Sequence, residues 1–209
     1  MEQELLIPNK EEFMNYIREF EKHEKRDAMY KVSMFIINSF WGNPKKVTDG
    51  LGVLLLTWNQ AFYRYGLFDF DKLEECIKRN SQKLEEFRNR DILNLSQQDE
   101  ESIKILFNDF LDALKISSGK KAGNKSPVSV AKALHLLAPK FFPLWDDRIA
   151  RAYMCYYSKD PEKRYIDFCK LMKKIAEKIK NFNIENSDKT ILKLIDEYNY
   201  AKYTKLWKS

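Results

Sequence analysis

Cysteine and histidine are scarce in this chain of 209 residues, and their scarcity excludes two kinds of site. The three cysteines form no CxxC pair, and they are too few for a disulfide framework or a four-cysteine metal cluster. We expect reduced thiols. The two histidines, His23 and His135, lie far apart in the sequence. We therefore expect no metal site.

Long apolar runs are missing as well. No window approaches the roughly 18 uninterrupted apolar residues of a membrane-spanning helix. The first ten residues, MEQELLIPNK, begin with acidic residues where a secretory signal has a basic stretch. We therefore expect an intracellular, cytoplasmic protein that does not associate with a membrane.

Apolar and basic residues are present in quantities that favour a folded domain with a polyanionic partner. Hydrophobic residues make up 44% of the chain, which suits one domain over residues 1–209. Lysine and arginine total 37 against 31 acidic residues, a net charge of +6. This excess mildly favours nucleic acid as the partner, although many lysine-rich helical proteins have a similar excess without that role.

The apolar residues recur at helical spacing along most of the chain, without competing strand-like alternation. The clearest stripe consists of Ile103, Leu106, Phe107, Phe110, Leu111 and Leu114. Residues 51–58 are apolar on all sides, which predicts a buried central helix. Asp160 and Pro161 are typical of an N-cap followed by the first helical turn.

Helix breakers occur at residues 42–44, at Gly66, at residues 117–127 and at residues 160–161. They divide the chain into about eight helices. We predict an all-α fold in two closely packed lobes. The segment 116–125 is expected to form a long loop between two of the helices.

The most informative segment is residues 129–151, SVAKALHLLAPKFFPLWDDRIAR. A short predicted helix is followed by an apolar turn, and Asp146 then opens a further helix that contains Ile149 and Arg151. This pattern resembles the helix-hairpin-helix DNA glycosylases, in which a proline often precedes the catalytic aspartate. The spacing of 17 residues from Ser129 to Asp146 is also similar to that of the family.

A second match lies upstream, where residues 54–60 resemble the buried helix whose polar end enters the gap left by a flipped base. The resemblance implies a two-lobed glycosylase fold with DNA as the partner. Ser129 stands where bifunctional members have a Schiff-base lysine. This difference implies hydrolysis without strand cleavage, as in the monofunctional, adenine-removing branch. The chain also resembles archaeal-type 8-oxoguanine glycosylases.

The resemblance assigns catalysis to Asp146. Breaking a base–sugar bond builds positive charge on the sugar, and a fixed carboxylate in a water-poor site stabilises that charge. An aspartate at a helix start is also an ordinary N-cap, and the two roles are compatible. Asp147 is interpreted as a helix-opening acid, and His135 as a partly buried residue with satisfied hydrogen bonds.

A base-binding pocket is expected around Trp58, Trp145 and Ser129. Asn59 and Gln60 are candidates to fill the place of the extruded base, with hydrogen bonding to helix ends as the alternative. The usual glycine turn of the hairpin is replaced by residues 125–128. We expect phosphate contacts from a set of basic side chains instead, namely Lys120, Lys121, Lys125, Lys132 and Arg151.

These expectations define a monomeric enzyme that hydrolyses the N-glycosidic bond of a damaged, mispaired or modified base, works without metal or organic cofactor, and is nucleoid-associated when bound to DNA. One alternative is a non-catalytic DNA- or RNA-binding domain of the same fold. A second alternative is a helical protein-interaction domain whose basic excess is incidental. Lys132 as an amine nucleophile is a further, less favoured reading.

Overall fold

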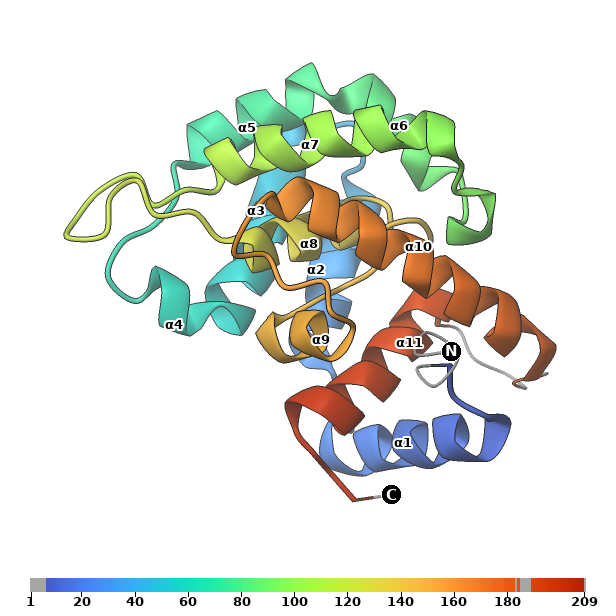
Figure 1. The fold of residues 1–209 in the computed structure, drawn as a ribbon. Helices are drawn as coiled ribbons and strands as arrows, with labels where there is room; N and C mark the ends of the chain where they lie inside the picture. Colours follow the sequence, from blue (N-terminus) through green and yellow to red (C-terminus); the bar gives the residue numbers. More distant parts are fainter. Residues whose placement is uncertain (1–6, 183, 185–188, 209) are drawn as a thin grey trace.

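A computed structural model describes residues 7–182, 184 and 189–208 (Figure 1). Within these residues there are eleven α-helices, nine of them with seven residues or more, and no β-strand. The expected all-α class is confirmed. The helices are α1 (Lys10–His23), α2 (Ala28–Ser39), α3 (Pro44–Trp58), α4 (Gln60–Tyr63), α5 (Phe70–Arg79), α6 (Ser81–Arg88), α7 (Glu100–Ala113), α8 (Pro127–Leu137), α9 (Asp147–Ala152), α10 (Pro161–Ile179) and α11 (Ile191–Asn199). A π-helical segment, η5 (Tyr200–Thr204), continues α11.

The helix count exceeds the expected eight partly because asparagines end helices that the apolar stripes run through. The sequence has a further apolar stripe at helical spacing, formed by Leu73, Ile77, Leu84 and Phe87. In the structure this segment is divided into α5 and α6 at Asn80, whose backbone lies at φ −99° and ψ 8°. The Asn80 amide donates to the Cys76 carbonyl at 3.0 Å and to Asp109 Oδ2 at 2.8 Å. An asparagine side chain that bonds to the backbone in this way competes with helix continuation.

Helix α3 lies at the centre and packs against α2, α5 and α8 (Figure 1). Leu51, Leu54 and Leu55 are fully buried, whereas Thr57 is exposed. The helix is therefore central, as expected, but it is not buried on all sides. Gly50 permits the close packing of α2, because a Cβ there would lie 2.9 Å from Ile37 Cγ1.

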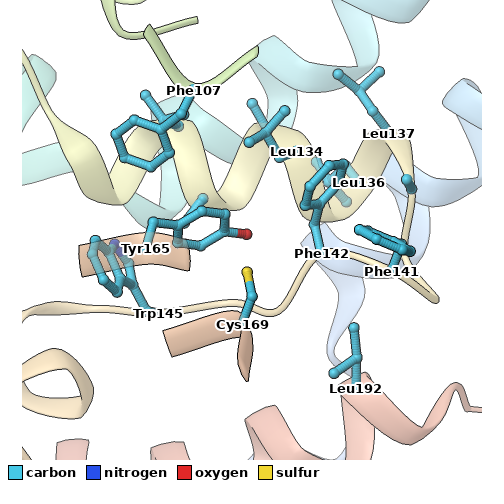
Figure 2. Close-up of a cluster of buried hydrophobic side chains, with 14 of the residues drawn as sticks. Phe107, Leu134, Leu136, Leu137, Phe141, Phe142, Trp145, Tyr165, Cys169 and Leu192 are labelled. Carbon is cyan, nitrogen blue, oxygen red and sulfur yellow. The ribbon is translucent and has the colours of Figure 1, made fainter. Parts of the chain in front are cut away.

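A buried hydrophobic cluster joins α7, α8 and α10 and holds the turn before α9 (Figure 2). The rings of Phe107 and Tyr165 lie 5.1 Å apart, and Phe142 packs beside Phe141 at 5.1 Å. The Tyr165 hydroxyl donates to the Pro143 carbonyl at 2.8 Å. These contacts fix the backbone just ahead of Asp146.

The two ends of the described chain meet. Helix α1 packs on α11 and η5, and α10 contacts α7 as well as α11 (Figure 1). Helix α10 begins at Pro161 as predicted, but Asp160 adopts φ 46° and its side chain accepts no helix N–H bond. Among the helices that the structure describes, none is long and apolar enough to cross a membrane.

Candidate functional site

A cavity of about 710 Å³ lies where segments from both halves of the chain meet. Its lining side chains come from the end of α1 and the following turn, the end of α3 with α4, the start of α8, the turn into α9, and α11 with η5. Of the side chains predicted to act at a site, Trp58, Asn59, Lys132, Trp145 and Asp146 line this cavity. The segments 54–60 and 129–151, which carry the resemblance and are far apart in sequence, thus meet at one cavity.

Asp146 is the N-cap of α9. Its Oδ1 accepts a hydrogen bond from the Ile149 backbone N–H at 2.8 Å, and its Oδ2 accepts one from Thr204 Oγ1 at 2.5 Å. The capping bond that the sequence suggested is confirmed. Thr204 was not foreseen, because it lies 58 residues away and reaches Asp146 only through the packing of η5 against α9.

Asp147 also lines the cavity, but its carboxylate is engaged with Arg151. Arg151 Nε donates to Asp147 Oδ2 at 2.9 Å, and the guanidinium carbon lies 3.6 Å from the centroid of the Tyr156 ring. The Arg151 side chain is exposed. Arg151 therefore lies on the surface, where Asp147 and Tyr156 hold its guanidinium group.

Lys132 lies in the cavity wall rather than on the outer surface. Its ammonium donates to the Trp58 carbonyl at 3.2 Å and also to Asn59 Oδ1. Burial lowers the pKa of Lys132 to about 8, although the nearby Asp146 carboxylate acts in the opposite direction. A lysine in this setting releases its proton more readily than a solvated one.

Asn59 connects Lys132 to Ser129. The Asn59 amide donates to Ser129 Oγ at 2.5 Å while its carbonyl oxygen accepts from Lys132. Ser129 is fully buried and is not among the described residues that line the cavity. Gln60, the first residue of α4, is exposed and also does not belong to the lining. Of the two amides, only Asn59 faces the cavity, and its hydrogen bonds hold Lys132.

The two tryptophans of the predicted pocket differ in their surroundings. Trp58 is partly buried and stacks on Tyr30 with ring centroids 6.1 Å apart. Trp145 is 1% exposed and packs edge-on against Tyr165 at 5.2 Å. Within the described part of the chain, Trp145 Nε1 has no hydrogen-bond partner.

A buried ion cluster around Lys193 forms another part of the wall. Lys193 Nζ lies 2.9 Å from Asp27, 3.2 Å from Asp196 and 3.9 Å from Glu197. Burial alone lowers the pKa of Lys193, but the three carboxylates raise it above its ordinary value. Sequence reasoning missed this cluster. Its only sequence signal is the spacing of three and four residues from Lys193 to Asp196 and Glu197 on one helix.

His135 has the structural role expected of it and is completely buried. Its Nδ1 lies 2.7 Å from the Phe142 carbonyl, and its Nε2 lies 3.0 Å from the Tyr30 hydroxyl. A carbonyl can only accept, so Nδ1 carries the proton and Nε2 accepts from Tyr30. Burial lowers the pKa of His135 to about 3.

The remaining lysine candidates lie in the loop between α7 and α8. Lys120, Lys121 and Lys125 are exposed, and Lys125 pairs with Asp112 at 3.6 Å. No tight glycine hairpin links the two described helices. Instead, Ser126 caps α8 by accepting the Ser129 N–H at 3.1 Å, and Pro127 forms the first helical position.

Nowhere in the ranges 7–182, 184 and 189–208 do three His, Cys, Asp or Glu side chains gather in a way that could hold a metal ion. No known protein family, curated protein or solved structure matches this chain. A functional assignment therefore depends on the cavity and on the residues that line it.

Proposed function

We propose that this protein is a monofunctional DNA glycosylase of the helix-hairpin-helix type, which hydrolyses the N-glycosidic bond of a base flipped out of DNA. The observation that carries the proposal is that Asp146 shares one cavity with Trp58, Asn59 and Trp145. A cavity of about 710 Å³ is within the range of small-molecule sites, roughly 300–1,000 Å³, and is large enough for a nucleobase with its sugar.

The chemistry requires a carboxylate that is fixed in place. Hydrogen bonds from Ile149 and Thr204 restrain both oxygens of Asp146, so little reorganisation is needed as positive charge develops on the sugar. The same carboxylate can orient or deprotonate the attacking water. Trp58 supplies aromatic surface against which an extruded base can pack, and the buried Trp145 supports the cavity wall.

A two-lobed glycosylase-like fold is part of this proposal. One lobe would contain α2 to α7, and the other would contain α1 with α10 and α11. Support comes from the position of the cavity, since its lining combines the end of α3 from the first group with α11 and η5 from the second. The lysines of the α7–α8 loop would then contact phosphates in place of the missing glycine turn.

The decisive experiment compares Asp146→Asn with the native protein on short duplexes that carry different lesions, with heat and alkali revealing abasic sites. We expect Asp146→Asn to lower the rate of base release by about two to three orders of magnitude, because asparagine keeps the capping oxygen and loses the charge. DNA binding and thermal stability should be nearly unchanged. Asp147→Asn is the matched control and should retain most of the activity.

Full activity of Asp146→Asn would contradict the catalytic assignment. Salt-dependent DNA binding without release of any base would favour the non-catalytic nucleic-acid-binding domain. Absence of DNA binding would favour the helical interaction protein.

Lys132 supports a second candidate function, cleavage of the strand at an abasic site. Its pKa of about 8 makes a fraction of the amine neutral near neutral pH, and it lines the same cavity as Asp146. A neutral amine can add to the C1′ aldehyde of the ring-opened sugar and lose water to form an imine.

Borohydride would reduce this imine to a stable amine and trap a protein–DNA adduct. The adduct should form with abasic DNA, disappear in Lys132→Met and persist in Lys178→Met, whose position is in the last turn of α10. If the native protein gives no adduct, strand cleavage by Lys132 is ruled out and hydrolysis alone remains.

A further inference from the structure

Two loops that lie close in sequence to cavity-lining residues are joined into one surface feature. The Ser117 backbone N–H donates to the Leu67 carbonyl at 2.8 Å, and the Ser117 hydroxyl donates to the same oxygen at 2.9 Å. We call residues 64–67 and 117–121 the ridge. Its two loop segments come so close that a Cβ on Gly66 would lie 2.4 Å from the Ser118 carbonyl oxygen.

The ridge exposes apolar and basic side chains together. Tyr65 is 56% exposed and Leu67 is 46% exposed. The Lys121 ammonium lies 5.1 Å from the centroid of the Tyr65 ring, and the Arg64 guanidinium carbon lies 5.6 Å from it. These two cations lie over the exposed ring, and both belong to flexible side chains that can turn from the ring to a phosphate. Such a site suits a partner that has both flat apolar rings and negative charges. Nucleic acid has both.

Both segments of the ridge lead directly into the cavity wall. Ala61 and Phe62 line the cavity just before Arg64, and Ser126 and Val128 line it just after the second loop. A strand with one nucleotide in the cavity would therefore pass the ridge with a neighbouring nucleotide.

We infer that Tyr65 stacks on an unpaired base adjacent to the flipped one, while Arg64 and Lys121 bind the flanking phosphates. The inference rests on the proposed function in taking nucleic acid as the partner and the cavity as the place of one flipped nucleotide. A ring on a protruding loop can stack only on a base whose face is open, and such faces occur in single strands and bulges. The protein should therefore bind unpaired DNA more tightly than fully paired duplex.

The test measures the binding of three unmodified DNAs by fluorescence anisotropy: a single strand, a blunt duplex and a duplex with a two-nucleotide bulge. Tyr65→Ala should weaken binding to the single strand and the bulge by about tenfold, on the scale of one lost stacking contact. Binding to the blunt duplex should change little. The slope of log Kd against log salt should stay the same, because no cation is removed.

Two further variants separate stacking from charge. Tyr65→Phe should bind like the native protein, and Lys121→Ala should reduce the salt slope by about 0.7 on the single strand. Equal binding of all three DNAs by the native protein, or an unchanged Kd in Tyr65→Ala, would overturn the inference. Thermal melting of each variant shows whether the fold is retained, which the exposure of Tyr65 leads us to expect.

The lesion screen distinguishes this result from the glycosylase proposal. If the native protein releases a base and Tyr65→Ala binds all three DNAs normally, the inference about the ridge is wrong and the glycosylase proposal stands. If the protein prefers unpaired DNA through Tyr65 but releases no base, the stacking role of Tyr65 is supported and the glycosylase proposal is wrong.

Discussion

At the scale of single residues, Asp146 and Lys132 in the cavity wall have their polar atoms engaged before any ligand binds. Asp146 has partners on both oxygens, and Lys132 has two carbonyl acceptors. Each of these hydrogen bonds contributes about 0.5–1.5 kcal/mol to stability, and more where a charged group takes part. Their larger effect is to keep the carboxylate and the amine in fixed positions.

His135 gives a pH-dependent prediction at this scale. Its pKa is about 3 in the folded protein and near 6.5 in the unfolded chain, so the unfolded chain binds one more proton between these values. The stability contributed by neutral His135 is complete above about pH 6.5 and is lost as the pH falls toward 3. The free energy of unfolding should lose about 1.4 kcal/mol per pH unit from this residue within that window.

Urea unfolding of the native protein and of His135→Gln at pH 4, 5, 6 and 7 measures this effect. The variant should be less stable at pH 7, where it lacks the ring's packing, and its stability should fall less steeply toward pH 4. Parallel pH profiles for the two proteins would show that His135 does not cause the acid sensitivity.

Some residue roles in the cavity wall and core could be predicted from the sequence, and others could not. The N-cap at Asp146 and the buried state of His135 follow from local context, because a capping position and an apolar stripe are defined by near neighbours in the chain. Thr204 and Lys193 could not be placed at the site. Each reaches it through helix packing between segments distant in sequence, which no short pattern records.

At the scale of elements, the two glycines of α3 allow a paired prediction. Glycine-to-alanine changes inside a helix gain about 1 kcal/mol from helix propensity. A Cβ at Gly50 would meet the fully buried Ile37 at 2.9 Å, and overpacking costs about 1–3 kcal/mol. Gly50→Ala should therefore destabilise the protein on balance.

Gly52→Ala is the matched comparison, since its Cβ would meet the Phe70 ring at 2.9 Å. Phe70 is 36% exposed and can turn aside, so this variant should be neutral or slightly more stable. Urea midpoints of the two variants measure the difference. Greater loss in Gly52→Ala than in Gly50→Ala would contradict this account of how α2 packs on α3.

Helix existence was predictable at this scale, whereas helix boundaries were less so. The stripe from Ile103 to Leu114 matches α7 because its period is local and complete. The break at Asn80 was hidden, since the apolar stripe continues through it and its amide bonds partly with Asp109 on a different helix.

At the scale of the whole molecule, the net charge of +6 leads us to expect that the proposed DNA binding is sensitive to salt. Neutralisation of about four to six phosphates would give a slope of log affinity against log salt of roughly −4 to −5 on duplex DNA. Replacing Lys120 and Lys121 with alanine should flatten the slope. Adding Lys125→Ala should change it little further, because Lys125 already pairs with Asp112.

Binding titrations from about 50 to 200 mM salt measure the slope. Lys178→Ala, in the last turn of α10, is the control for loss of a charge elsewhere. An unchanged slope in the double variant would show that the α7–α8 loop is not part of the DNA interface.

The closure of the cavity by both ends of the described chain has a consequence for synthesis. Phe20, Glu24 and Asp27 are among the first cavity residues to leave the ribosome, whereas Lys193 and Thr204 are among the last. A nascent chain arrested before α11 has neither the counter-charge for Asp27 nor the hydroxyl that restrains Asp146. A nascent chain therefore cannot complete the wall of this cavity until residue 204 has emerged from the ribosome.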